Sequence, residues 1–249
     1  MYRFFTDKNN INIPEKKVII TGTDMNHIKN VLRMKPGEEV SVVAFGDDKE
    51  YRCGISEYTD DEVVLTLLFV KESNVELGCK VVLYQALPKA DKMELIIQKA
   101  VELGASRIVP VSAGRSVVRL DETRAAKKIA RWNSISEAAA KQSKRAIIPE
   151  VSNVMTMEEA LDDCRDFETK IIPYELSDPD SMEETRKIMG SLKSGTEVAI
   201  FIGPEGGFTD EEIALAKQAG AFPVTLGHRI LRTETAGLVV LSWIIYNCE

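Results

Sequence analysis

Histidine and cysteine are scarce in this chain, and their positions argue against most metal chemistry. The 249 residues include two histidines, His27 and His228, and four cysteines. The cysteines lie far apart and form no CxxC pair, so the sequence predicts neither a zinc site nor a disulfide framework; they are Cys53, Cys79, Cys164 and Cys248. We therefore expect a reduced protein without a bound metal ion.

Long apolar runs are missing as well. No stretch approaches the length of a membrane-spanning helix, and the first ten residues, MYRFFTDKNN, lack the apolar segment of a signal peptide. Apolar residues make up 44% of the chain and charged residues 29%, as in ordinary globular proteins. These features predict a cytoplasmic protein with no membrane partner, long enough for one or two domains.

Positive charge is in deficit over the whole chain. The formal net charge of -7 argues against a general nucleic-acid binder. Between Arg115 and Arg145, however, nine basic residues face only three acidic ones. A polyanion could bind there, or the charges could form a solvated helix face, and the pattern alone leaves both interpretations open.

The first part of the chain has the pattern of a small β-domain. Short apolar runs alternate with turn residues up to about residue 70, which predicts a barrel or a sandwich. Within it, HIKNVLRMKPG predicts a short helix that ends near Pro36 and Gly37. The polar, turn-rich stretch KESNVELG marks a boundary, so we predict domains at 1–72 and 73–249.

From residue 80 onward, strands alternate with helices. The predicted strands include KVVLYQAL, RIVPVS, TKIIPYE, EVAIFIG and FPVTLG, and the predicted helices span roughly 121–142, 180–192, 209–219 and 233–247. Asp91 with Glu94, and Thr156 with Glu159, have the spacing of capping boxes. The last helix is apolar nearly all round, so we expect it to be buried. The alternation predicts an α/β domain with a mostly parallel sheet.

A glycine-rich loop, FIGPEGGFTDEE, follows one of these strands. Its glycines fit neither the Rossmann fingerprint nor the P-loop, and it contains no lysine. The helix after it begins at Thr209 with three acidic residues, which occupy the place that a phosphate would need. The loop therefore favours a nucleoside-like ligand without phosphate, especially a cationic one, and the alternative is a plain glycine turn.

Three strand ends in this domain carry unusual residues. Glu175 follows one strand, the glycine-rich loop follows the next, and LGHRILRTETAGL follows the last with Arg229, Arg232 and Glu234. In open α/β sheets, ligands bind at the carboxyl ends of the strands. These ends could form one pocket, and the alternative for the charged loop is an internal salt bridge.

These motifs together resemble a known family. FIGPEGGFTDEE, LGHRILRTETAGL, LPKADKMELIIQKAVELG, RSVV and EAAAKQSKR, with HIKNVLRMKPGEEV in the first domain, resemble the bacterial 16S ribosomal RNA uracil-N3 methyltransferases of the SPOUT superfamily. The resemblance implies a PUA-like β-barrel that binds RNA, followed by a SPOUT-type parallel α/β domain with a C-terminal trefoil knot. It also implies S-adenosylmethionine as cofactor, a homodimer, and 16S RNA in the assembled small ribosomal subunit as substrate. Two positions depart from the family pattern, Lys141 where an acidic residue is expected and His228 where proline is common.

The resemblance also assigns roles to residues. The implied cofactor contacts are Glu175, Ile202, Gly203, Glu205, Gly206, Leu226, Gly227, Ile230, Leu231 and Thr235. Arg232 is expected to stabilise the uracil anion, and Glu234 or Glu205 to accept the N3 proton, which requires a raised pKa. The expected phosphate contacts are Arg3, Lys29, Arg33, Lys89, Arg115 and Arg145.

Two other functions remain compatible with the sequence. A ribose 2′-O-methyltransferase of the same superfamily would attack a hydroxyl instead of a base nitrogen. A non-catalytic factor could keep the fold and bind RNA without the cofactor. A nicotinamide enzyme is disfavoured because the phosphate-binding fingerprint is missing.

Overall fold

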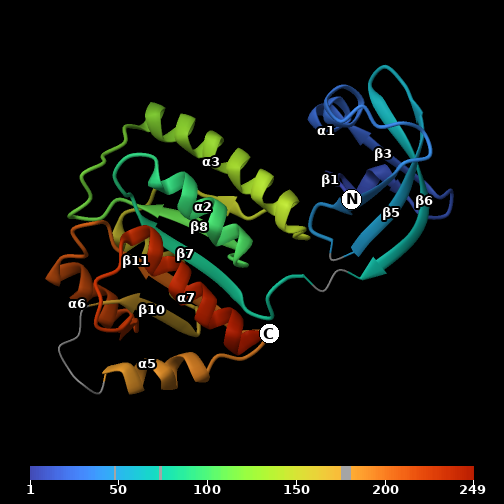
Figure 1. The fold of residues 1–249 in the computed structure, drawn as a ribbon. Coiled ribbons are helices and arrows are strands. Elements are labelled where there is room, and N and C mark those ends of the chain that lie inside the picture. The colour runs from blue at the N-terminus through green and yellow to red at the C-terminus, as the bar shows by residue number, and fades with distance from the viewer. Residues whose placement is uncertain (48, 73–74, 175–180) are drawn as a thin grey trace. The chain divides into compact units, whose positions relative to one another are not determined.

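The computed structural model describes residues 1–47, 49–72, 75–174 and 181–249 (Figure 1). The chain forms two compact units. The first comprises Met1–Glu76 together with Ala140–Ile148, and the second comprises Leu77–Ala139 together with Pro149–Glu249. The segment 140–148 thus belongs to the first unit, although it lies far along the chain from the rest of that unit.

The first unit is built on a six-stranded sheet within the described residues, in the order β1-β4-β5-β6-β3-β2. The strands are β1 (Arg3–Thr6), β2 (Ile11–Asn12), β3 (Lys17–Thr21), β4 (Glu39–Ala44), β5 (Lys49–Tyr58) and β6 (Glu62–Glu72). The Thr6 hydroxyl donates to the Ile19 carbonyl oxygen at 2.8 Å, so β1 also contacts β3 and the sheet curls round its core. Alternate apolar residues fill that core, as the period of two predicts. The predicted β-barrel domain is confirmed.

A short helical stretch follows β3 in this unit. It consists of α1 (Gly22–Asn26) and a π-helical turn (His27–Val31), after a 3-10 turn at Lys8–Asn10. The helix ends before the predicted Pro36–Gly37, because Arg33 already adopts a left-handed backbone conformation with a φ of 52°.

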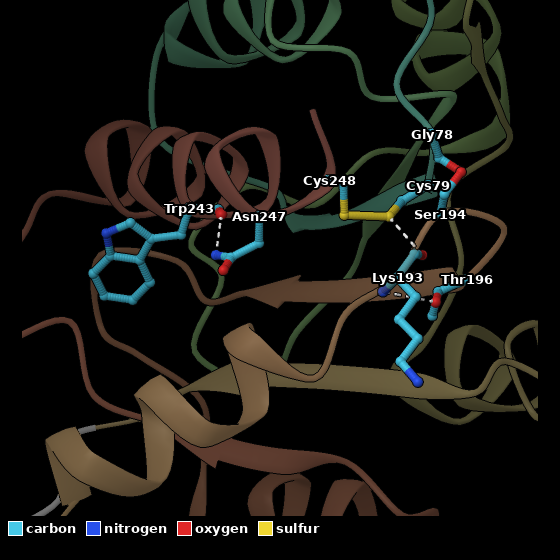
Figure 2. Close-up of a disulfide and its surroundings, with 8 residues drawn as sticks. All are labelled: Gly78, Cys79, Lys193, Ser194, Thr196, Trp243, Asn247 and Cys248. Carbon is cyan, nitrogen blue, oxygen red and sulfur yellow. Dashed lines mark hydrogen bonds between the residues drawn. A yellow bond between two sulfur atoms is a disulfide. The ribbon is translucent and has the colours of Figure 1, made fainter.

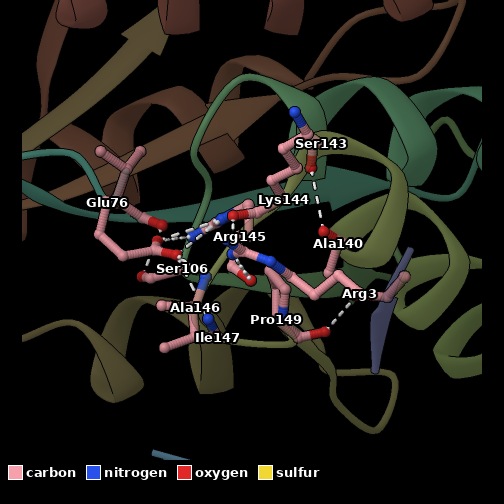
Figure 3. A network of polar contacts seen from close by, with 12 residues as sticks. Arg3, Glu76, Ser106, Ala140, Ser143, Lys144, Arg145, Ala146, Ile147 and Pro149 are labelled. Atoms are coloured by element: carbon pink, nitrogen blue, oxygen red, sulfur yellow. Dashed lines mark hydrogen bonds and ion pairs between the residues drawn. The ribbon is translucent and has the colours of Figure 1, made fainter. Parts of the chain in front are cut away.

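Glu76 anchors the segment 140–148 in the first unit (Figure 3). Its carboxylate accepts hydrogen bonds from the backbone N–H groups of Ala146 at 2.8 Å and Ile147 at 3.2 Å. The Arg145 guanidinium forms an ion pair with the same carboxylate at 2.5 Å. A carboxylate with several donors is a strong local anchor, since each bond to an ionised group is stronger than a neutral one.

Arg3 binds the same segment from strand β1. Its guanidinium donates to the carbonyl oxygens of Lys144 and Arg145 and pairs with Glu50 at 2.6 Å. Arg3 is 8% exposed and Arg145 only 3% exposed. A buried guanidinium needs such partners, because desolvation of an unpaired charge is expensive. Both arginines therefore hold the first unit together.

The second unit contains a six-stranded sheet in which every described pairing is parallel. The order is β12-β10-β11-β7-β8-β9, with β7 (Lys80–Ala86), β8 (Arg107–Val111), β9 (Glu150–Val151), β10 (Thr169–Pro173), β11 (Glu197–Ile202) and β12 (Phe222–Val224). The predicted parallel α/β domain is confirmed. The three strand ends singled out in the sequence belong to the neighbours β12, β10 and β11, so they lie at one edge of the sheet.

Helices cover both faces of this sheet. They are α2 (Lys92–Glu102), α3 (Glu122–Ser143), α4 (Met157–Asp163), α5 (Ser181–Gly190), α6 (Asp210–Gln218) and α7 (Thr233–Cys248). Helices α4 and α6 pack on the face that carries Tyr84 and Phe201, whose rings stack with centroids 4.6 Å apart. Helix α7 lies on the opposite face with α2 beside it, and Gly237 lets α7 approach Leu83 and Ile202 (Figure 1).

Strands β7 and β11 are neighbours, yet their connections leave in opposite directions. The chain runs from β7 through α2 to β8 on one side, and from β11 through α6 to β12 on the other. Such a reversal opens a crevice at the carboxyl ends of the two strands, which is where open α/β sheets bind ligands.

All three predicted helix starts are confirmed, at Asp91, Thr156 and Thr209, but only two of them have a side-chain cap. Thr156 and Thr209 both form complete capping boxes with the glutamate three residues on. The capping box predicted at Asp91 is wrong, because the Asp91 side chain makes no cap hydrogen bond. Its intended partner Glu94 instead binds Arg131 of α3 through two bonds, at 2.5 and 2.8 Å. A bidentate arginine outcompetes a backbone N–H for a carboxylate.

A disulfide joins Cys79 to Cys248, so the prediction of a chain without disulfides is wrong (Figure 2). The two residues are 169 positions apart, but the fold brings the start of β7 and the end of α7 within a Cα–Cα distance of 6.4 Å. Spacing along the chain could not show this. The other cysteines are free and buried, and burial raises the pKa of Cys53 to about 12 and that of Cys164 to about 11.

None of the helices in the described part of the chain is both long and apolar enough to cross a membrane.

Candidate active site

The glycine-rich loop, residues 203–208, leaves β11 and folds back on itself before α6. A Cβ atom on Gly203 would lie 3.3 Å from the Cα of Gly207 and from the Phe208 side chain. Gly207 has a φ of 68°, in the left-handed region that favours glycine. Both positions therefore require glycine for the turn itself, and the loop keeps its backbone close to the crevice.

Two charged side chains fix this loop to its neighbours. Arg115, after β8, donates to the carbonyl oxygens of Gly206 at 3.2 Å and Phe208 at 3.0 Å. Glu212 accepts from the backbone N–H groups of Gly114 at 2.8 Å and Thr209 at 2.7 Å. The N-terminus of α6 is thus capped by its own carboxylate, which leaves no room there for a phosphate.

The start of α7 is tied to the same loop. The Thr233 hydroxyl donates to the Gly203 carbonyl oxygen at 2.7 Å and accepts from the Gln85 side chain at 2.9 Å. Gln85 is fully buried at the end of β7, and its amide oxygen finds no hydrogen-bond partner among the described residues. The sequence signal was available, since Gln85 is the one amide side chain inside the run VVLYQAL. The ends of β7, β11 and α7 therefore form one connected frame.

Lys92, the first residue of α2, lies between the two carboxylates predicted as proton acceptors. Its ammonium is 3.0 Å from Glu205 and 3.2 Å from Glu234. Glu205 also accepts from the backbone N–H of Lys89, at 3.2 Å. Sequence reasoning missed Lys92, because nothing in its spacing relates it to residues more than a hundred positions away.

The pKa values of both carboxyls lie below their ordinary value. Burial acts to raise the pKa of Glu205, but hydrogen bonds from Lys92 and from backbone N–H groups outweigh it. For Glu234 burial also acts to raise the pKa, and a backbone N–H, Lys92 and Arg232 together lower it. The raised pKa that we expected of a general base is therefore found at neither residue, and both stay ionised at neutral pH.

Arg232 is exposed at the position preceding α7. Its guanidinium makes no hydrogen bond or ion pair with a residue in the described ranges, and its positive charge acts on Glu234. An arginine with free donors beside an ionised carboxylate can receive a developing negative charge.

The other predicted cofactor residues lie along the same edge or outside the described residues. Glu175 belongs to the latter. Leu226, Gly227 and Leu231 are half-buried after β12, with Gly227 at a φ of 98°, while Thr235 is exposed on the first turn of α7. Ile230 is 91% exposed.

The predicted RNA-binding residues fall into two groups. Arg33 and Lys89 are exposed, and Lys29 is half-buried with its ammonium donating to the Thr59 carbonyl oxygen at 3.1 Å. Arg3 and Arg145 are buried in ion pairs, and Arg115 is exposed but donates to the glycine-rich loop. Much of the basic stretch that follows is exposed, including Arg119, Arg124, Lys127 and Arg131.

Within the described ranges, no group of three or more His, Cys, Asp or Glu side chains is arranged to hold a metal ion.

Comparisons with known proteins agree with this geometry. A family model described as an RNA methyltransferase domain matches residues 75–245, and one described as an RNA methyltransferase PUA domain matches residues 20–68. The chain is 38% identical to the ribosomal RNA small subunit methyltransferase E of Bacillus subtilis, over 100% of this chain and 98% of that protein.

Two similar solved structures contain a bound cofactor. The ribosomal RNA small subunit methyltransferase E of Neisseria gonorrhoeae, bound to S-adenosyl methionine, superposes with a TM-score of 0.81 at 32% identity, over 97% of this chain and 95% of that one. A methyltransferase of Legionella pneumophila in complex with the cofactor SAM also gives 0.81, at 31% identity over 98% and 96% of the two chains.

Proposed function

Because this chain belongs to the ribosomal RNA small subunit methyltransferase E family, we propose that it transfers a methyl group from S-adenosylmethionine to N3 of a uracil in 16S ribosomal RNA. The observation that carries the proposal is the crevice between β7 and β11. Its glycine-rich loop is closed to phosphate by Glu212, and its rim holds two ionised carboxylates and Arg232, which has no partner in the described ranges. A nucleoside-like, cationic cofactor suits that combination.

The residues of the crevice fit this cofactor. When bound, S-adenosylmethionine supplies an electrophilic methyl group on a positively charged sulfur. Glu205 and Glu234 share one ammonium, that of Lys92. Two carboxylates and one ammonium have a net negative charge, which favours a cationic cofactor nearby. The apolar side chains of Ile202, Leu226 and Leu231 would hold the adenine, and backbone groups of the loops would bind its edge.

Methylation at N3 requires the uracil nitrogen to lose its proton. Arg232 stabilises the anion, whose charge spreads onto the two ring oxygens, because its guanidinium donors have no partner in the described residues. Glu234, two residues on, accepts the proton. Its lowered pKa makes it a weak base, but it keeps the carboxylate ionised and ready at neutral pH.

The proposal extends to the whole chain. The first unit acts as a PUA-like RNA-binding domain, with Lys29 and Arg33 on phosphates. The C-terminal segment forms a trefoil knot and a homodimer interface. The interface is supported by Tyr246, a large aromatic side chain on the mostly apolar α7 that is 87% exposed. The location is the cytoplasm, where ribosomal subunits are assembled.

The product can be identified directly. Small ribosomal subunits that lack the modification should accept one labelled methyl group, and mass spectrometry of the digested RNA should place it on a uracil base. Naked 16S RNA, assayed beside the subunits, tests whether assembly is required. A methyl group on a ribose would favour the 2′-O-methyltransferase, and absent calorimetric binding of S-adenosylmethionine would favour a non-catalytic RNA-binding factor.

RNA binding should weaken steeply as salt rises. For about five phosphate contacts on single-stranded RNA, the affinity should fall roughly a hundredfold between ~50 and ~200 mM salt. The double variant Lys29→Ala/Arg33→Ala should reduce the slope of log affinity against log salt by about 1.4, or ~0.7 for each contact.

A matched control for this measurement is Arg165→Ala. Arg165 is exposed, as Arg33 is, but it pairs with Asp162 and Asp166, outside the proposed surface. The control should keep the wild-type slope. A salt response that is flat, or equal in the double variant and the wild type, would contradict the proposed phosphate contacts.

A further inference from the structure

Three separate segments meet at the Lys92 ammonium. Helix α2 provides Lys92 itself, the glycine-rich loop provides Glu205, and the first turn of α7 provides Glu234. The three side chains are only partly exposed, at 26%, 27% and 18%. The ammonium is therefore the charged link between the ends of β7 and β11 and the start of α7.

The two carboxylates depend on this link in different ways. Glu205 has other donors, because the Lys89 N–H also reaches it. Glu234 also has a backbone N–H donor, but its other oxygen is fully buried and makes no hydrogen bond within the described residues, so it depends more on the ammonium. The Lys92 ammonium lies 3.2 Å from that same oxygen and compensates its charge.

We propose that Lys92 is a positioning residue of the methyl-transfer site, which holds Glu205 and Glu234 together as an ionised pair. This role rests on the proposed function, but the state of the two carboxylates can be measured without it. Lys92 need not touch the substrate, since it acts through the two glutamates.

The electrostatics give the role a direction. Two carboxylates that share one ammonium are close neighbours, and without it each disfavours ionisation of the other. The Lys92 nitrogen lies 3.0 Å from an oxygen of Glu205 and 3.2 Å from one of Glu234, which places the two carboxylates close together. Arg232 also acts on Glu234. Removal of Lys92 should therefore move a proton onto the pair at a higher pH, as a coupled titration.

The pair can be tested in the ligand-free protein. We expect Lys92→Met to shift the titration of at least one of the two carboxyls upward by about one pH unit or more. Carboxyl ¹³C shifts of glutamate-labelled protein report this, with Glu205→Gln and Glu234→Gln assigning the signals. Lys92→Arg keeps the charge and should titrate as the wild type does.

Lys99→Met is the matched control. Lys99 is another lysine of α2, but it pairs with Glu102 outside the site. It should leave both titrations unchanged. Unchanged titrations in Lys92→Met, or a shift that Lys92→Arg fails to restore, would overturn the proposal.

Catalysis provides the second measurement. In Lys92→Met the acidic limb of the kcat/KM profile should move toward neutral pH, and activity on that limb should fall about tenfold for each pH unit that it moves. A loss of equal size at every pH would indicate a merely structural role. If wild-type protein transfers no methyl group while the titrations behave as described, the proposed function fails and the carboxylate pair stands.

Discussion

Replacement of Arg232 by alanine should reduce the rate of methyl transfer by roughly 10²–10³-fold, the range for loss of one preorganised donor to a developing anion. Arg232 precedes α7, and its guanidinium has no partner among the described residues, so its donors are available to the substrate. Binding of S-adenosylmethionine should change little, because the side chain acts on the uracil. Single-turnover kinetics with saturating cofactor and calorimetry would measure the two quantities separately.

Arg229→Ala is the control for this prediction. Arg229 lies in the same loop and carries the same charge on an exposed side chain. Both variants lose one positive charge, but only Arg232→Ala loses the donor that is assigned to the uracil. Arg229→Ala should therefore retain most of the rate. Arg232→Lys should recover only part of the rate, since an ammonium lacks the planar fork of donors. Wild-type turnover in Arg232→Ala would refute the assigned role.

Loss of the Cys79–Cys248 disulfide should have the largest effect on stability. The bond closes a loop that spans a sequence separation of 169 residues. The chain-entropy model gives about 5 kcal/mol for a loop of that size. Denaturant unfolding of Cys248→Ser, compared with the oxidised wild type, should show a correspondingly lower free energy of unfolding.

Reductant distinguishes the effect of losing the disulfide bond from the effect of replacing the Cys248 side chain. It should destabilise the wild type toward the value of Cys248→Ser and leave that variant unchanged. Alkylation of the denatured, unreduced protein should label the two free cysteines, Cys53 and Cys164. Labelling of all four cysteines would show that the bond does not form. Both redox forms matter, because the cytoplasm, the proposed location, is reducing.

The alternation of strands and helices, and the rejection of a phosphate ligand, could be predicted from the sequence. Both depend on neighbours along the chain. Apolar residues at periods of 2 and 3.6 decide which face of an element is buried, and the acidic start of α6 lies within a few residues of the loop that it closes. Thr156 and Thr209 cap their helices as predicted for the same reason. The resemblance then supplied the cofactor and the reaction.

Only the tertiary structure decided which charges meet. Arg3 and Arg145 were predicted to contact RNA phosphates, yet each is buried against a carboxylate within the first unit. Asp91 and Glu94 have the spacing of a capping box, yet Arg131 takes the glutamate. An ion pair depends on distance in space, and its strength rises with burial, so a pattern along the chain does not predict it.

The centre of the site shows the same division. The glycines, Glu205, Arg232 and Glu234 could be selected from their motifs, because a turn or a helix start fixes what each needs nearby. Lys92 and the Cys79–Cys248 bond could not, since each joins segments about a hundred residues apart or more. Local periodicity determined the elements, and the packing of β7, β11 and α7 brought together the side chains of the proposed methyl-transfer site.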